Sequence, residues 1–133
     1  MSIRQFIGQF INNHTETAES HYDERLRTRY YKTSKDKAMH AVESVLSSSG
    51  WKIKEAETGR GEVIAEPQKG GQSLLVATIV MVKPYRTAID ISCSSGTSLP
   101  SDFGKSKKIV VAIYEKLDKE LPYLGTGMAD EFV

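Results

Sequence analysis

The sequence lacks most of the features that mark specialised classes of protein. Its 133 residues include one cysteine, four prolines and ten glycines. A single cysteine excludes an internal disulfide framework and a cysteine-rich zinc site, and so few prolines and glycines exclude a collagen-like chain. No run of about 18 apolar residues is present, so no membrane-spanning helix is expected. The 18 basic and 17 acidic residues almost cancel, whereas a dedicated nucleic-acid binder usually carries a basic excess.

Motifs for catalysis and cofactor binding are incomplete. Gly59-Arg60-Gly61 lacks the third glycine of a dinucleotide fingerprint, because position 64 is Ile. Gly104-Lys105-Ser106 is similar to the end of a phosphate-binding loop, but Leu99 stands where that loop needs its first glycine. The three histidines and one cysteine show no metal-ligand spacing. No catalytic residue, metal ligand or cofactor is therefore predicted, and an enzyme is the less favoured reading.

A smaller hypothesis survives for Gly104, Lys105 and Ser106. These residues begin the last expected helix, and the free N–H groups of a helix start can hold an anion. Lys107 and Lys108 follow at once and add positive charge. The three residues are a candidate anion site, and the alternative is an ordinary solvated helix start.

What is present is the pattern of one α+β domain. Apolar periodicity predicts helices over residues 34–48 and 105–121. Strands are expected over residues 51–55, 62–66, 73–82 and 87–93, with a further short strand over 27–32. Hairpin-length connections predict an antiparallel meander of four to five strands, in the order (β)-α-β-β-β-β-α, with both helices on one face. The almost wholly apolar segment 73–82 is expected at the sheet centre with both faces covered.

The two ends of the chain are expected to lie outside that domain. Residues 1–24 predict an amphipathic helix followed by an acidic linker, residues 25–122 the single domain, and residues 123–133 a loosely ordered tail. The apolar stripe of the N-terminal helix consists of Ile3, Phe6, Ile7, Phe10 and Ile11. Interruption by polar residues argues against a secretory signal, so a cytoplasmic location is expected. We interpret the stripe as a surface that packs on the domain or on a second copy; a membrane anchor would need more basic residues than Arg4.

Two further segments are candidate interaction surfaces. Residues 25–37 carry six basic side chains and one acidic side chain, and they include Arg27, Arg29 and Tyr30. Basic residues beside aromatics can bind single-stranded nucleic acid, and the alternative is a set of solvated strand and helix edges. Arg86 and Asp90 are four residues apart and so share a face of their expected strand. Asp90 then either pairs with a neighbouring cation or lines a polar pocket.

Three short motifs also carry a resemblance. They are Arg27-Thr-Arg-Tyr-Tyr-Lys32, Arg60-Gly-Glu-Val63 and Pro84-Tyr-Arg-Thr-Ala-Ile-Asp90. Together they resemble a family of small cytosolic proteins of unknown function from Gram-positive bacteria, over about residues 22–121. The resemblance implies a bacterial cytosolic protein and transfers no catalytic residue.

These observations favour a non-enzymatic cytosolic binding or adaptor domain that acts through protein–protein contacts. The partner is another protein or a second copy of the chain. The alternative is a small-molecule carrier with an apolar cavity between the sheet and the C-terminal helix. Nucleic acid is not an expected partner.

Overall fold

The computed structural model describes residues 14–94 and 105–128 of the chain. The expected N-terminal helix and Gly104 lie outside these residues. Two α-helices, α2 (Lys35–Ser48) and α3 (Lys105–Glu120), accompany a one-turn 3₁₀ helix, η1 (Glu24–Leu26). The strands are β1 (His14–Glu16), β2 (Arg29–Tyr31), β3 (Trp51–Glu57), β4 (Glu62–Pro67), β5 (Leu74–Lys83), β6 (Arg86–Ser94) and β7 (Tyr123–Thr126).

All seven strands join one antiparallel sheet. Its order is β3-β4-β5-β6-β2-β7, and β1 pairs with the far end of β6. The short strands β1 and β2 thus lie one after the other along the same edge of β6. This confirms the predicted α+β class with two helices and an antiparallel sheet.

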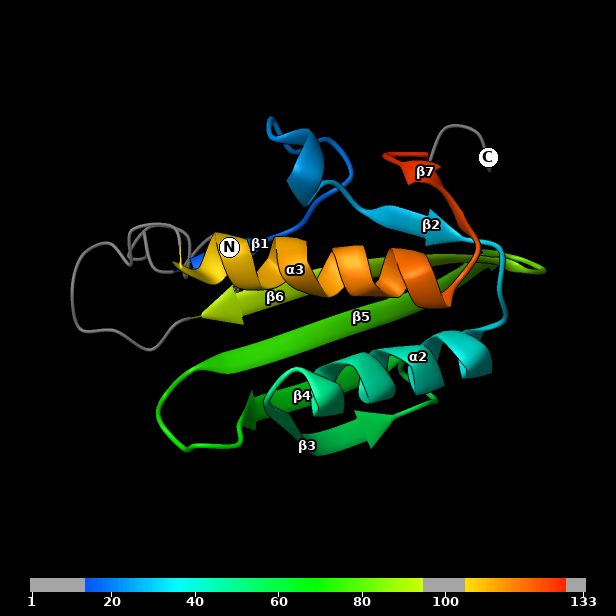
Figure 1. Cartoon of the computed structure of the whole chain (residues 1–133). Helices are drawn as coiled ribbons and strands as arrows, with labels where there is room; N and C mark the ends of the chain where they lie inside the picture. The colour runs from blue at the N-terminus through cyan, green and yellow to red at the C-terminus, as the bar shows by residue number, and fades with distance from the viewer. Residues whose placement is uncertain (1–13, 95–104, 129–133) are drawn as a thin grey trace.

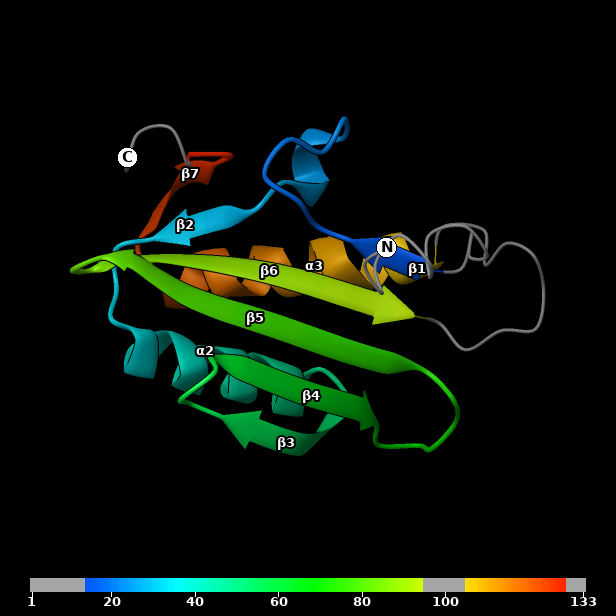
Figure 2. The same ribbon diagram turned by 180° about the vertical axis from the view of Figure 1, so that it is seen from behind.

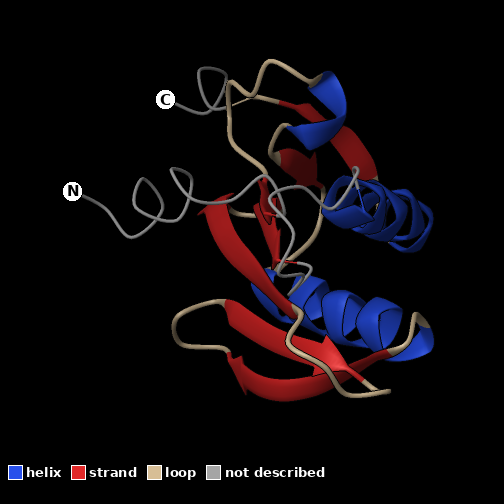
Figure 3. Cartoon of the chain, turned by 90° about the vertical axis from the view of Figure 1, so that its left-hand side faces the viewer, coloured by secondary structure: helices blue, strands red, loops and turns tan. Residues whose placement is uncertain are grey.

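Both long helices cover the same face of the sheet (Figure 1), and Figure 3 shows this from the side. α2 packs over β3, β4 and β5, while α3 packs over β6 and β1. The opposite face is seen in Figure 2 and carries none of the described helices. The core lies between the two layers, where side chains such as Leu46, Ile79, Ile89 and Leu117 are completely buried.

Local signals place the helices where the sequence predicts them. The Ser34 side chain accepts the Lys37 backbone N–H and so caps the start of α2. Gly50 follows the helix with a φ of +90°, a conformation that suits glycine. In α3 the buried positions Val110, Ile113, Tyr114 and Leu117 recur at helical spacing and face the sheet.

The prediction of four to five strands is wrong, because the sheet has seven. β1 and β7 contain three and four residues, too few to show the alternation that reveals a half-buried strand. β7 also contains Gly125, and its register with β2 shifts between Tyr30 and Tyr31. The tail after the last helix therefore folds back onto the sheet edge.

The expectation that residues 73–82 are covered on both faces is also wrong. Leu75, Ala77 and Ile79 are buried beneath the helices, but Leu74 and Val80 on the opposite face are exposed. The apolar run is a one-sided strand with an unusually apolar outer face. None of the described helices is long and apolar enough to cross a membrane.

Candidate functional site

Strands β5 and β6 form a long hairpin that ends in a turn of two residues. Lys83 lies opposite Arg86 in the ladder, so Pro84 and Tyr85 alone make the loop. The proline ring holds φ at about −65°, while Tyr85 has a φ of +57°. This sequence of φ values is that of a type II turn, whose second central position normally takes glycine or asparagine. Tyr85 therefore occupies a conformation that costs an L-residue about 1–2 kcal/mol.

Four exposed apolar side chains lie in or beside this turn, and we call this group the hairpin tip. Its members are Val80, Met81, Val82 and Tyr85. Their exposed fractions run from 39% for Val82 to 62% for Tyr85. The turn projects beyond the other elements at this end of the molecule (Figure 2). A register shift between Met81 and Lys83 marks a bulge in β5 beside the turn, and bulges commonly redirect side chains at binding sites.

The margin of the hairpin tip is positively charged. Lys83 is exposed, and Arg86 next to it donates from Nη1 to the Tyr85 carbonyl at 2.8 Å. No acidic residue stands between positions 80 and 87. The exposed apolar side chains of the tip are thus bordered by two cationic side chains.

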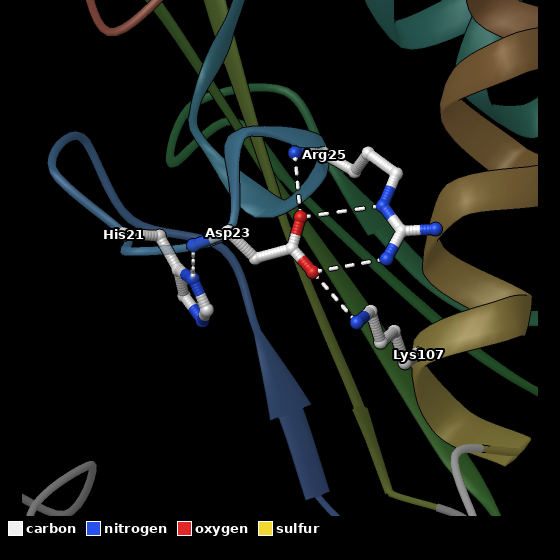
Figure 4. Close-up of polar contacts among 4 residues, drawn as sticks. All are labelled: His21, Asp23, Arg25 and Lys107. Atoms are coloured by element: carbon white, nitrogen blue, oxygen red, sulfur yellow. Dashed lines mark hydrogen bonds and ion pairs between the residues drawn. The ribbon is translucent and has the colours of Figure 1, made fainter.

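A second region centres on η1, which a single carboxylate fixes to the start of α3 (Figure 4). Asp23 accepts the backbone N–H of Arg25 at 3.0 Å and the guanidinium of Arg25 at 3.2–3.3 Å. Lys107 Nζ lies 2.6 Å from Asp23 Oδ2, the oxygen that also accepts from Arg25 Nη2. The hydrogen bonds from Arg25 and then Lys107 hold the pKa of Asp23 well below its ordinary value.

Arg25 lines two hollows. The first, of about 340 Å³, is lined by Arg25, Lys107, Lys108, Val111, Ala112 and Glu115. The second, of about 230 Å³, is lined by Glu24, Arg25, Arg29, Tyr123 and Thr126, and we call it the Arg29 recess. It lies between η1, β2 and β7, so it depends on the strand that the tail adds to the sheet.

Arg29 is a buried cation, with only 9% of its surface exposed. It faces the helices because it sits opposite Ile89 in the ladder with β6. Its Nη1 donates to Asp118 on α3, and Tyr31 donates its hydroxyl to the other oxygen of Asp118 at 2.7 Å. The guanidinium carbon lies 4.6 Å from the ring centroid of Tyr114 and 5.7 Å from that of Tyr123, both within cation–π range.

A third polar cluster fills the gap between β1 and β2. Thr17 and Thr28 both donate to Asp90 Oδ1 at 2.7 Å. Tyr114 donates from α3 to the Ile89 carbonyl at 2.7 Å and contacts the Thr17 hydroxyl at 3.1 Å. Burial raises the pKa of Tyr114. These hydrogen bonds satisfy buried polar groups in the segment between β1 and β2, the two short strands that pair with β6. The cluster therefore stabilises the fold.

The structure places the other predicted residues as follows. Arg27 donates to the His21 carbonyl at 2.8 Å and lies 3.9 Å from a carboxylate oxygen of Glu24. Tyr30 is buried on the sheet face opposite Arg29 and donates to Glu19. Ser106 is also buried and shares a 2.6 Å hydrogen bond with the Thr15 hydroxyl, while Lys105 is exposed at the start of α3. The five apolar residues of the N-terminal stripe lie outside the described part of the chain.

The structure therefore brings only some of the candidates together. Arg29 lies with Arg25 beside the recess, whereas Arg86 lies at the hairpin tip and Asp90 in the threonine cluster. Sequence reasoning missed Met81 and Val82, which it assigned to a covered strand, and Tyr123 and Thr126, which it assigned to a tail. For the first pair the available signal was the two-residue Pro84-Tyr85 turn, which forces the end of β5 out of the core.

No protein-family model matches this chain, and no curated protein matches it. Within residues 14–94 and 105–128, no three His, Cys, Asp or Glu side chains are gathered to hold a metal ion.

Proposed function

We propose that this protein is a non-enzymatic, cytoplasmic binding domain that contacts a protein partner through the hairpin tip. The observation that carries the proposal is Tyr85, which combines a strained backbone with an exposed ring. A glycine or asparagine would make the same turn without that cost. Strain at an exposed residue is typical of sites where the side chain is needed for contact.

The composition of the hairpin tip defines the chemistry of the partner. Tyr and Met are enriched at the centres of protein interfaces, where they fill apolar pockets. Lys83 and Arg86 at the border favour carboxylates on the opposing surface. We therefore infer a partner protein that offers an apolar recess bordered by Asp or Glu side chains.

The carrier hypothesis requires a cavity between the sheet and α3, and the packing there does not favour it. Ile89 and Ile91 of β6 meet Val110, Ile113 and Leu117 of α3, and all five side chains are buried. A small ligand is better sought at the molecular surface.

Photo-crosslinking in the source cells tests the proposal. p-Benzoylphenylalanine introduced at position 85 should crosslink a specific protein. The same group at Lys54, an exposed position on β3, serves as the control and should not crosslink that protein. Crosslinks between two copies of this chain would identify the partner as a second copy and overturn the proposal of a different protein. Crosslinks to lipid alone would overturn the proposal of a protein partner.

Two substitutions that introduce a negative charge then check binding to the crosslinked partner in purified form. Met81→Glu should weaken binding ten- to a hundredfold, because one buried apolar side chain contributes about 1.5–3 kcal/mol. Leu74→Glu is the matched control, since Leu74 is equally apolar and similarly exposed (41% against 46%) at the other end of the same strand. Equal affinity of wild type and Met81→Glu would contradict the proposal.

A further inference from the structure

The Arg29 recess has the features of a built anion site. Its floor is Arg29, of which only 9% is exposed; an arginine is rarely so buried unless it is paired, as Arg29 is with Asp118. Its volume of about 230 Å³ is smaller than the roughly 300–1,000 Å³ of sites for drug-sized ligands. The recess therefore fits a small molecule, or the end group of a larger one.

The fold holds the Arg29 side chain in one position before any ligand arrives. Asp118 binds one end of the guanidinium, and the rings of Tyr114 and Tyr123 lie within 4.6 and 5.7 Å of its central carbon. Thr126 is the register partner of Arg29 across the β2–β7 ladder, so its side chain is fixed beside the same guanidinium. A preorganised donor loses little conformational freedom on binding.

One donor of Arg29 remains unused. Its Nε is buried and has no hydrogen-bond partner among the described residues. A buried donor without an acceptor destabilises the fold, so such a group calls for a specific explanation. Asp118 does not supply the acceptor: it accepts from Arg29 Nη1 and from the Tyr31 hydroxyl, and Nε is left without a partner.

We propose that the Arg29 recess binds a small oxyanion, a carboxylate or a phosphate, through the guanidinium groups of Arg29 and Arg25. Both anions present two oxygens at the spacing of the guanidinium fork. Arg29 forms the floor of the site, and Arg25 closes it from η1. The Tyr123 ring provides a wall for the carbon skeleton of the ligand, and the Thr126 hydroxyl lines the same site.

The charges around the recess support an anion with a polar or zwitterionic body. Arg29 is balanced by Asp118 and Arg25 by Asp23. A bound oxyanion would share the guanidinium donors with these two carboxylates, which already balance their charge. We therefore expect a modest affinity. Glu24 at the rim has an exposed carboxylate, which repels a second negative charge and favours a cationic group at the outer end of the ligand.

Nuclear magnetic resonance tests the site directly in the full-length protein. Because Arg29 Nε–H is buried, it should exchange slowly with water and give its own signal in a ¹H–¹⁵N spectrum. Titration with inorganic phosphate and, separately, with acetate should shift that signal saturably, together with the amides of Arg25 and Thr126. Sodium chloride at equal ionic strength should cause no saturable shift. Saturation by one of the two anions alone would assign the ligand class.

Two substitutions with a matched control complete the test. Arg25→Ala should weaken anion binding about tenfold, the worth of one charge-assisted hydrogen bond. Arg60→Ala is the control, because Arg60 is similarly exposed and also forms a single ion pair, with Glu55, at a distant turn. Arg29→Lys keeps the charge but removes the fork, and it should abolish binding while circular dichroism shows the fold intact.

Several outcomes would overturn the proposal. They are a shift that is the same in chloride, no saturation by either anion, and unchanged binding in Arg25→Ala. If Arg29→Lys fails to fold, the Arg25 and Arg60 variants still decide the question. The hairpin tip shares no residue with the recess, so failure here leaves the proposed protein contact untouched, and failure at the tip leaves the anion site untouched.

Discussion

The turn at Tyr85 allows backbone strain to be separated from the contribution of the aromatic ring. Replacement by alanine and by glycine removes the same ring and the same partial burial, so the two variants differ only at the backbone. At a φ of +57°, alanine pays the left-handed penalty of about 1–2 kcal/mol. Glycine escapes it but loses about 0.5–1 kcal/mol more entropy on folding. Tyr85→Gly should therefore be more stable than Tyr85→Ala by about 1 kcal/mol.

Urea unfolding followed by circular dichroism measures this difference. The midpoint of Tyr85→Gly should be higher at an unchanged m-value, and its melting temperature should exceed that of Tyr85→Ala by roughly 3–5 °C. Both variants should lose affinity for the crosslinked partner to the same degree, because both lack the ring. If Tyr85→Ala is as stable as Tyr85→Gly, the turn is not strained and the reasoning that singled out Tyr85 fails.

Three further tests, two of them with a matched control substitution, address the fold and its electrostatics. Asp118→Asn leaves the buried Arg29 guanidinium without its ion pair and should lower the free energy of unfolding, measured in urea, by about 3 kcal/mol. Its control, Glu55→Gln, breaks an exposed ion pair and should lower that free energy by less than about 0.5 kcal/mol. Gly61→Ala places a Cβ 2.0 Å from a backbone carbonyl oxygen at a φ of +68° and should lower the free energy of unfolding by about 3 kcal/mol or more. Its control, Gly70→Ala, has a φ of +84° but places its Cβ in open space, so it should lower the free energy of unfolding by only about 1–2 kcal/mol. Because the pKa of Asp23 is lowered from 3.8, its stabilisation is present above that value and is lost as the pH falls below it. The difference in unfolding free energy between wild type and Asp23→Asn should therefore shrink between about pH 5 and pH 2, and a constant difference would contradict the assigned partners.

The parts of the fold that the sequence predicts are those with a repeated local signal. The stripe of α2 and the alternation along β6 each extend over many residues, and both elements fall where expected. β7 has no such signal, because four residues containing a glycine look like any loop. It becomes a strand only because the end of α3 brings it beside β2, which is a long-range event that local propensity does not encode.

The candidate sites show the same limit. The sequence predicts Arg29 as one member of a basic run that either binds a partner or is solvated, yet Arg29 is buried and paired with Asp118, which is 89 residues away in the chain. The alternation of side chains along β2 predicts part of this arrangement, because Arg29 and Tyr31 lie on one face of the strand and Tyr30 lies on the other. It does not say which face the helices cover. The exposure of Met81 could not be predicted for a related reason. An apolar run predicts a strand, but it does not predict where the helix that covers the strand ends.

The register of strand β2 decides which side chains line the Arg29 recess. On one side the strand pairs with the half of β6 nearest the turn, placing Arg29 opposite Ile89 and Tyr31 opposite Thr87. On the other side it pairs with β7 and so completes the Arg29 recess. A shift by one residue would exchange the faces of the whole strand and send the guanidinium to the open side. Tyr30 opposes such a shift through its hydrogen bond to Glu19, and Tyr31 does so through Asp118. The two tyrosines on opposite faces of a three-residue strand thus fix its register from both sides, and this explains how so short a strand can hold a buried charge in place.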